Sequence, residues 1–369
     1  MKPALPFIDQ ALQLARHAVG HSEPNPHVGC VIVSADAQKV LGIGRTQSVG
    51  RAHAEIMALQ NAIDQGHSLL GATAYVTLEP CSHHGRTGPC CDALIAAGIK
   101  KVVASIADPN PLVSGQGFER LRAAGIDVEI GPGADESREL NLGFFSRMIR
   151  KTPWVRMKVA ASLDGKTALD NGVSQWITSE AARADGHAWR ARSCAVLTGI
   201  GTVLGDNPRL DVRAVDTLRQ PHLVVVDSRL ETPLDAQLFD ADRTLYIYAA
   251  EQNDARQAAL EARGATVIYL PGPNGKVDLA AMLRDLAQRE VNEIHVEAGH
   301  KLTGSLLREG LIDECLVYLA PSLIGQGAGL ASFGPITALS QAVALEFRSA
   351  DQLGPDLRIL ARVKGRDRF

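Results

Sequence analysis

One histidine, one glutamate and two cysteines in the first quarter of the sequence have the types and order of a catalytic zinc site. A single alanine separates His53 from Glu55, and Cys81 and Cys90 follow downstream. Zinc favours imidazole and thiolate ligands, and three protein ligands leave the fourth tetrahedral position open to water. Bound zinc lowers the pKa of such a water to about 7, and Glu55 is suited to carry protons from it to a leaving amine. The pattern predicts zinc-dependent hydrolysis with Glu55 as the catalytic residue and His53, Cys81 and Cys90 as metal ligands.

A closed structural zinc site is the alternative interpretation of the same residues. Cys91, His83 or His84 would then be the fourth ligand, and no position would remain for water. Glu55 would have no task in such a site, so the open arrangement is favoured. Cys91, beside Cys90, is interpreted as a packed helix residue.

The order H-A-E, E-P-C and P-C resembles the cytidine-deaminase-like superfamily, whose signature is H-x-E followed by P-C-x-x-C. In this sequence eight residues, 82–89, separate the two cysteines instead of two. With that insertion, the segment TLEPCSHHGRTGPCCDALIAAGI closely resembles the pyrimidine deaminases of riboflavin biosynthesis, as does PNPHVG at residues 24–29. The resemblance implies a diaminopyrimidinone ribosyl phosphate as substrate, with Asn25 binding its base. The loop residues that would face the sugar phosphate are His83, His84 and Arg86.

Four motifs rich in small and polar residues follow in the second part of the sequence. They are KVAASLDGKT at residues 158–167, SQWIT at 174–178, GIGTVLGDNP at 199–208 and VEAGHKLTGS at 296–305. The last is a predicted strand that ends in a turn and opens a helix, whose free backbone N–H groups favour phosphate. It is not G-x-G-x-x-G, so a Rossmann fingerprint is absent. An ordinary helix cap at Gly299 is the alternative interpretation of the turn.

Together these motifs resemble the reductase of the same riboflavin pathway, which has a dihydrofolate-reductase-like fold and uses NADPH. The resemblance extends from about Pro153 to near the C-terminus. The cofactor contacts that it implies are Ala160, Trp176, Thr202, Asp206, Ser228, Gly299, His300, Lys301, Leu302, Thr303, Gly304 and Ser305. The substrate contacts that it implies are Ser174, Arg190, Leu210, Arg213 and Glu297. Guanidinium groups bind phosphate oxygens in a bidentate fork, which suits a ribosyl phosphate.

Hydrophobic periodicity predicts two different α/β domains that position these residues. In the first, the predicted strands are 30–33, 39–43, 73–78, 101–105 and 127–130, and the helices are 7–18, 52–65, 90–97, 118–124 and 137–148. In the second, the predicted strands are 154–160, 194–198, 222–226, 244–248, 267–270, 293–296 and 314–319, and the helices are 180–192, 255–262, 279–288 and 302–309. A basic, proline-stopped stretch marks the boundary. We expect a cytidine-deaminase-like α/β/α domain at residues 1–150, the zinc-dependent pyrimidine deaminase, and a dihydrofolate-reductase-like α/β domain at 151–369, the NADPH-dependent reductase.

The whole chain of 369 residues resembles the bifunctional deaminase–reductase of riboflavin biosynthesis. The resemblance implies hydrolytic deamination of 2,5-diamino-6-(ribosylamino)-4(3H)-pyrimidinone 5′-phosphate. NADPH then reduces the ribosyl group to ribityl, which gives 5-amino-6-(ribitylamino)uracil 5′-phosphate. The resemblance also implies a homodimer formed through the reductase half.

Composition and charge oppose other function classes. A net charge of −3 and an aromatic content of 4% disfavour a nucleic-acid partner. A nucleoside or tRNA deaminase fused to an unrelated domain is one alternative, and a non-catalytic zinc scaffold is another. The N-terminus lacks a signal-peptide core and no apolar run reaches about 18 residues, so we expect a cytoplasmic protein without a membrane span.

Overall fold

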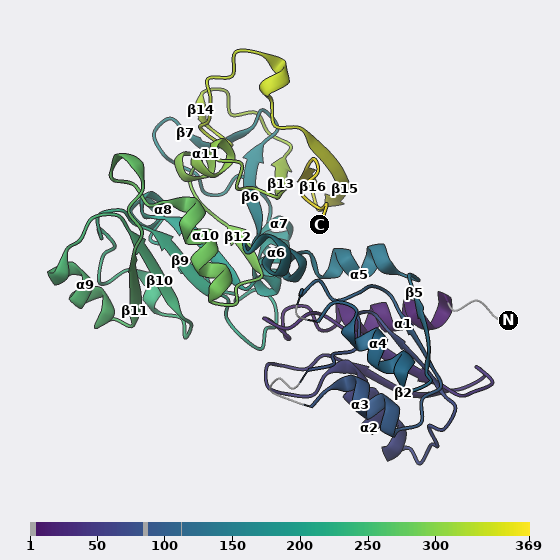
Figure 1. Ribbon diagram of the computed structural model, residues 1–369. Coiled ribbons are helices and arrows are strands. Elements are labelled where there is room, and N and C mark those ends of the chain that lie inside the picture. Colours follow the sequence, from purple (N-terminus) through teal and green to yellow (C-terminus); the bar gives the residue numbers. More distant parts are fainter. Residues whose placement is uncertain (1–4, 84–87, 112) are drawn as a thin grey trace. The chain divides into compact units, whose positions relative to one another are not determined.

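The computed structural model describes residues 5–83, 88–111 and 113–369. The chain forms two compact units, Met1–Arg150 and Lys151–Phe369. Figure 1 draws the first unit in purple to blue and the second in teal to yellow. Each unit is an α/β structure built on one main sheet.

The sheet of the first unit has the strand order β2-β1-β3-β4-β5. Strand β1 is antiparallel to both of its neighbours, whereas β3, β4 and β5 are parallel to one another. The strands are β1 (Gly29–Val33), β2 (Val40–Arg45), β3 (Thr73–Val76), β4 (Lys101–Ala104) and β5 (Asp127–Ile130). The helices are α1 (Leu5–Arg16), α2 (Ala54–Asp64), α3 (Cys90–Ala96), α4 (Gln116–Ala123), α5 (Ala134–Leu140) and α6 (Leu142–Arg150). Because β3 and β4 are parallel, the loops that follow them leave from the same edge of the sheet, and these loops contain Cys81 and Asp108.

Three glycines let two helices lie directly against the β1–β2 hairpin. A Cβ atom on Gly29 would lie 1.9 Å from the Ala11 carbonyl oxygen of α1. On β2, Cβ atoms on Gly42 and Gly44 would lie 2.2 and 2.1 Å from carbonyl oxygens of α2. These separations are far below van der Waals contact, so a side chain would force the helices away. The close packing holds the first turn of α2, which carries Glu55, against the sheet.

The sheet of the second unit has the strand order β11-β10-β9-β8-β12-β6-β13-β16-β15. The strands from β11 to β13 in this order are parallel, and the antiparallel pair β16 and β15 completes one edge. The strands are β6 (Trp154–Ser162), β8 (Ala195–Gly199), β9 (His222–Val226), β10 (Leu245–Ala249), β11 (Ala265–Tyr269), β12 (Glu293–Val296), β13 (Glu314–Ala320), β15 (Leu345–Leu353) and β16 (Asp356–Val363). A separate small sheet pairs β7 (Lys166–Leu169) with β14 (Gly327–Gly329). The helices are α7 (Glu180–Arg192), α8 (Ile200–Asp206), α9 (Asp254–Glu261), α10 (Leu279–Gln288) and α11 (His300–Arg308).

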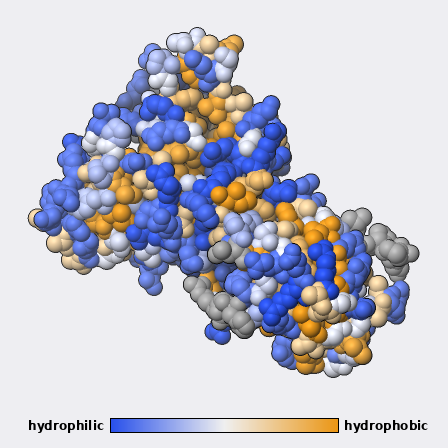
Figure 2. Space-filling view, in the orientation of Figure 1, coloured by the Kyte–Doolittle hydropathy of each residue, from blue (hydrophilic) through white to orange (hydrophobic). Residues whose placement is uncertain are grey.

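The larger core of the second unit forms where α10 covers its sheet. Leu283 and Leu286 of α10 are buried in the same cluster as Val155, Leu197 and Ile294 of three parallel strands. Figure 1 shows α10 crossing in front of this sheet, and Figure 2 shows hydrophilic and apolar side chains mixed over the visible face of both units. Parallel strands covered on both faces carry nearly continuous apolar runs, which is why the sequence pattern predicts them.

One expected helix is wrong, and several elements of the second unit were not predicted. The helix predicted at 137–148 is two helices, because Asn141 leaves helical geometry and its side chain bonds the backbone of His27. The hairpin of β15 and β16 is absent from the sequence prediction, since most side chains of β15 are exposed and it lacks an apolar run. Helix α8 and strands β7 and β14 are absent from it as well. Within the described ranges, no helix is both long and apolar enough to cross a membrane.

Candidate active sites

Three elements of the first unit bring His53, Cys81 and Cys90 together. His53 is the N-cap of α2, Cys90 is the first residue of α3, and Cys81 lies in the loop after β3. The Sγ atoms of Cys81 and Cys90 lie 3.6 and 3.4 Å from His53 Nδ1, and all three ligand atoms lie within 4.8 Å of one another. A tetrahedral zinc ion, with bonds of about 2.3 Å to sulfur and about 2.0 Å to nitrogen, places such atoms roughly 3.5 Å apart. The three side chains therefore fit a zinc ion with one open coordination position.

Glu55 stands beside this group in the first turn of α2 and is only 4% exposed. Burial, together with the negative charge of Cys81, raises the pKa of its carboxyl group to about 7. A carboxyl group with a pKa near the working pH can both accept and donate a proton. Its position and protonation behaviour both suit proton transfer.

The other candidate zinc ligands lie outside the group. The Cys91 thiol donates to two backbone carbonyls, Pro80 O at 3.1 Å and Gly117 O at 3.5 Å. His83 is exposed, and among the residues that the structure describes the metal-ligand group has no fourth member. His84 and Arg86 lie outside the described residues. The closed four-ligand interpretation therefore has no support from Cys91 or His83.

Glu79 opens the E-P-C motif near this site, but sequence reasoning assigned its side chain no role. Its carboxylate is 4% exposed and accepts hydrogen bonds of 2.8 to 3.4 Å from the backbone N–H groups of Asp108, Gly115, Gly117 and Phe118. It thereby holds the loop between β4 and α4, together with the first turn of α4, against the segment that carries Cys81. The sequence signal for this role is the position of Glu79 in the E-P-C motif, right after a predicted buried strand. A buried carboxylate there needs hydrogen-bond donors from the surrounding chain.

Asn25 lies in a loop before β1 that other residues hold in shape. The Asn25 N–H donates to the Ser22 carbonyl oxygen at 2.9 Å, and the Ser22 hydroxyl donates to the Asn25 carbonyl oxygen at 3.3 Å. The Asn141 amide accepts from His27 N at 2.7 Å and donates to His27 O at 3.0 Å. These hydrogen bonds hold the loop that is predicted to receive the base.

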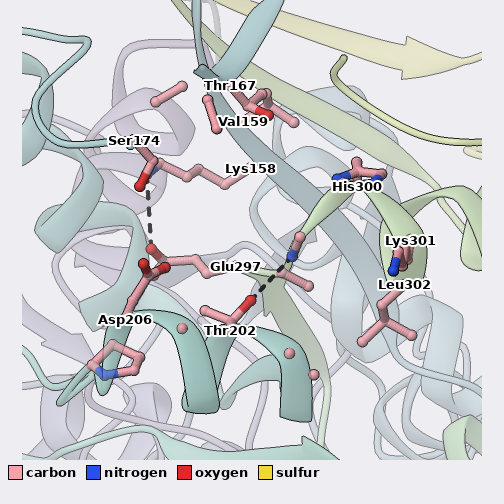
Figure 3. A pocket seen from close by; sticks show the side chains of 18 of the residues that line it. Lys158, Val159, Thr167, Ser174, Thr202, Asp206, Glu297, His300, Lys301 and Leu302 are labelled. Carbon is pink, nitrogen blue, oxygen red and sulfur yellow. Dashed lines mark hydrogen bonds and ion pairs between the residues drawn. The ribbon is translucent and has the colours of Figure 1, made fainter. Parts of the chain in front are cut away.

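A pocket of 2210 Å³ opens in the second unit at the carboxyl ends of β6, β8, β9 and β12. Ligands of open parallel sheets bind at this edge. All of the substrate contacts predicted for the reductase line it, namely Ser174, Arg190, Leu210, Arg213 and Glu297. The predicted cofactor contacts that line it are Ala160, Trp176, Thr202, Asp206, Ser228, Gly299, His300, Lys301, Leu302 and Ser305. Figure 3 shows part of this lining.

Thr303 and Gly304 are the predicted cofactor contacts that do not line the pocket. Thr303 is 2% exposed, and its hydroxyl donates to the Ala298 carbonyl oxygen at 3.3 Å. A Cβ atom on Gly304 would lie 1.9 Å from the Ser332 carbonyl oxygen. Successive residues of a helix point in different directions, so only part of the first turn of α11 can face one cavity. These two residues pack the helix instead.

The N-terminus of α11 faces the pocket at Gly299, the N-cap residue. The Gly299 N–H donates to the Thr202 hydroxyl of α8 at 3.2 Å, which ties the two helix starts together (Figure 3). His300 and Lys301 also line the pocket; His300 is half-buried and Lys301 is exposed. Backbone N–H groups and a cation at a helix start are suited to a phosphate ligand.

Glu297, directly after β12, is held by two cations at the pocket wall. Arg190 Nε and Nη2 lie 2.7 and 3.1 Å from its two carboxylate oxygens, and Lys158 Nζ lies 3.8 Å from one of them (Figure 3). Burial acts to raise the pKa of Glu297, but Arg190 and Lys158 hold it well below its usual range. Lys158 and His187 line the pocket too. Sequence reasoning assigned neither of them a role: Lys158 opens the motif at residues 158–167, whereas His187 lies outside all four motifs.

Known proteins match both units. Residues 1–106 match the cytidine and deoxycytidylate deaminase zinc-binding region, and residues 153–359 match the RibD C-terminal domain. The chain is 44% identical to the riboflavin biosynthesis protein RibD of Escherichia coli (strain K12), over 95% of this chain and 97% of that protein. It is 40% identical to RibD of Aquifex aeolicus (strain VF5), over 96% of each chain. The chain belongs to the RibD family.

Solved RibD structures share the fold of this chain. Acinetobacter baumannii RibD (form 1) matches with a TM-score of 0.87 at 40% identity, covering 97% of this chain and 98% of that one. A Thermotoga maritima protein, named a diaminohydroxyphosphoribosylaminopyrimidine deaminase/5-amino-6-(5-phosphoribosylamino)uracil reductase, matches with a TM-score of 0.85 at 31% identity, covering 97% and 98%. These matches confirm the predicted fold class, with its cytidine-deaminase-like and RibD reductase domains.

Membership of the RibD family makes this chain a bifunctional deaminase and reductase of riboflavin biosynthesis. The predicted family and function are therefore confirmed, against the unrelated-fusion and scaffold alternatives. The zinc-binding deaminase region and the His53, Cys81 and Cys90 group support Zn²⁺ as a cofactor. The RibD reductase domain indicates a nicotinamide cofactor.

Proposed function

We propose that residues 1–150 deaminate 2,5-diamino-6-(ribosylamino)-4(3H)-pyrimidinone 5′-phosphate and that residues 151–369 then reduce its ribosyl group with NADPH. The observation that carries the first step is the group of three zinc-ligand atoms beside the buried carboxyl group of Glu55. The pocket at the carboxyl edge of the second sheet supports the second step. The two activities named for the Thermotoga maritima relative are consistent with this order of reactions.

In the deaminase, His53, Cys81 and Cys90 hold the zinc ion, which supplies Lewis-acid activation of water when bound. Glu55 takes a proton from the attacking water and delivers it first to the pyrimidine ring nitrogen. It then transfers the remaining proton of that water to the amine. Ammonia leaves, and the oxygen of the water stays on the ring carbon. A carboxyl group with a pKa of about 7 suits this double role. Asn25 binds the base.

In the reductase, the start of α11 and Thr202 bind the phosphates of NADPH. Ala160, Trp176, Asp206 and Ser228 position the remainder of the cofactor. Ser174, Arg190, Leu210, Arg213 and Glu297 bind the pyrimidine ribosyl phosphate. NADPH held by these residues would supply the hydride that reduces C1′ of the ring-opened imine of the sugar, and the product would be 5-amino-6-(ribitylamino)uracil 5′-phosphate.

The preference for NADPH over NADH and the homodimer through the second unit rest on the family resemblance of the sequence. The cytoplasmic location rests on the expected lack of a signal-peptide core and of a membrane span. A small pyrimidine ribosyl phosphate is the ligand of both units in this proposal. A net charge of −3 does not favour a nucleic-acid ligand.

The decisive experiment follows ammonia release and NADPH oxidation together on the diaminopyrimidinone ribosyl phosphate. We expect ammonia first, NADPH loss after it, and no signal from either when a zinc chelator is present. With the chelator and the already deaminated substrate, NADPH oxidation should continue, because that step does not use the zinc group. Ammonia release without NADPH loss would overturn the reductase assignment, and chelator-resistant ammonia release would overturn the zinc assignment.

A further inference from the structure

Cationic side chains gather on one wall of the second-unit pocket. Arg190, Arg209 and Arg213 all line it, and their guanidinium groups all donate to Asp211. Arg190 donates to the Asp211 backbone carbonyl, whereas Arg209 and Arg213 donate to the Asp211 carboxylate. Arg190 also pairs with Glu297. Three guanidinium groups thus face two carboxylates, and Lys158 shares Glu297 with Arg190. The wall keeps an excess of positive charge that suits an anionic group of a ligand.

His187 lies inside this cluster, on α7 one turn before Arg190. It is 8% exposed and lines the pocket. Its Nδ1 accepts the backbone N–H of Arg213 at 3.4 Å and lies 3.4 Å from Arg190 Nη1. Because two donors converge on Nδ1, the hydrogen-bond network assigns the ring proton to Nε2.

The ring stays neutral in this environment. Burial, followed by the positive charges of Arg190 and Arg213, lowers the pKa of His187 to about 4. At neutral pH the imidazole therefore carries one N–H donor and no charge. In the described part of the chain no hydrogen-bond partner is found for Nε2, whereas Nδ1 is already engaged. The Nε2–H of His187 is therefore available to donate a hydrogen bond to a ligand in the pocket.

We propose that His187 donates its Nε2–H to a phosphate oxygen of the substrate, between Arg190 and Arg213, and so helps the reductase select phosphorylated substrate. The inference rests on the proposed function of the second unit. Two guanidinium groups supply charge, and a neutral donor adds a directed hydrogen bond without more repulsion between cations. A second role follows from the same contacts, since Nδ1 holds the backbone of Arg213 in place.

The test compares the deaminated substrate with its dephosphorylated form in the full chain at saturating NADPH. We expect His187→Ala to reduce the preference for the phosphorylated form, expressed as a ratio of kcat/KM values, by about tenfold, mainly through KM. His187→Gln should retain most of that preference, because its amide offers one acceptor and one donor. Ammonia release by the first unit and the KM for NADPH should stay unchanged in both variants. An unchanged preference in His187→Ala, or an equal loss for both substrate forms, would overturn the proposal.

A binding measurement decides the proposal without turnover. In the full chain with ¹⁵N-labelled histidine, ribose 5-phosphate should shift the Nε2 signal that disappears in His187→Ala. Ribose at the same concentration should leave that signal in place. His222→Ala is the matched control, since His222 is a partly buried histidine at the start of β9 that does not line the pocket. In His222→Ala, ribose 5-phosphate should still shift the Nε2 signal of His187.

The kinetic and binding experiments together distinguish failure of the proposed function from failure of the inference about His187. A wild-type chain that reduces no pyrimidine substrate would overturn the proposed function, while the response of His187 to ribose 5-phosphate would still decide the inference. Turnover with no phosphate-dependent change at His187 would overturn the inference alone.

Discussion

Arg190 and Glu297 form a two-point ion pair at the wall of the second-unit pocket, although 107 residues separate them in the chain. Arg190 belongs to α7, and Glu297 directly follows β12. Lys158 Nζ and His295 Nε2 lie 3.8 and 3.6 Å from the same carboxylate. The protein therefore holds Arg190, Lys158 and Glu297 in place through their contacts with one another.

Replacing Glu297 by glutamine removes the counter-charge of the buried Arg190 guanidinium. Loss of one partner of a buried pair costs about 3–5 kcal/mol. We expect Glu297→Gln to lower the free energy of unfolding of the second unit by roughly this amount in denaturant titrations. Glu261→Gln, at an exposed position on α9, is the control and should stay within about 0.5 kcal/mol of wild type. Equal stabilities of the two variants would contradict the expectation.

The same carboxylate predicts a loss of stability in acid. Burial acts to raise the pKa of Glu297, but Arg190 and Lys158 hold it well below its usual range, so the unfolded chain takes up the proton first as the pH falls. The stabilisation is complete above the unfolded pKa of about 4.3 and is lost as the pH falls through the folded-state value. Between about pH 6 and about pH 3, the free energy of unfolding should fall more steeply in wild type than in Glu297→Gln. Parallel pH profiles would argue against this role.

Glu55→Gln should separate metal binding from proton transfer. Glutamine has a similar shape but cannot carry the proton, so ammonia release should fall roughly 10²–10⁴-fold. Zinc content should be unchanged, because Glu55 is not a member of the ligand group. NADPH oxidation on deaminated substrate serves as the folding control. Wild-type ammonia release by the variant would remove Glu55 from the mechanism.

Two adjacent cysteines provide a matched pair for the zinc site. Cys90→Ser should sharply lower the zinc content of the purified chain, measured by metal analysis, because a serine hydroxyl is a poor replacement for a thiolate ligand. Cys91→Ser should retain zinc, since the Cys91 thiol is directed to the carbonyls of Pro80 and Gly117. Comparable zinc loss in both variants would show that the ligand set is wrong.

Glu79→Ala tests whether one carboxylate holds the loop between β4 and α4. The substitution removes the acceptor of four backbone N–H groups, two of which belong to Gly115 and Gly117. Hydrogen bonds to a charged acceptor are worth about 1.5–3 kcal/mol each, so we expect at least about tenfold faster amide exchange at these two glycines. Glu136→Ala, at an exposed position on α5, is the control. Unchanged exchange in Glu79→Ala would mean that the loop holds its shape by other contacts.

Local patterns predicted the zinc group because its members stand at the ends of regular elements. His53 caps one helix and Cys90 opens another, so short motifs locate them within a predicted fold. Glu79 carries no comparable signal, because its partners are backbone groups about thirty to forty residues away. The break at Asn141 was hidden for a similar reason, since the amide that interrupts the helix bonds a loop 114 residues earlier.

The sequence by itself determined the family, the two α/β domains and the classes of chemistry, because residue types and short spacings limit both local conformation and possible ligands. Tertiary structure alone decided which predicted residues line the pocket and which form the zinc-ligand group. It turns Thr303 and Gly304 into helix packing, directs the Cys91 thiol away from the zinc group and pairs Arg190 with Glu297. The physical reason is that side-chain direction, burial and charge balance depend on contacts between segments far apart in the chain.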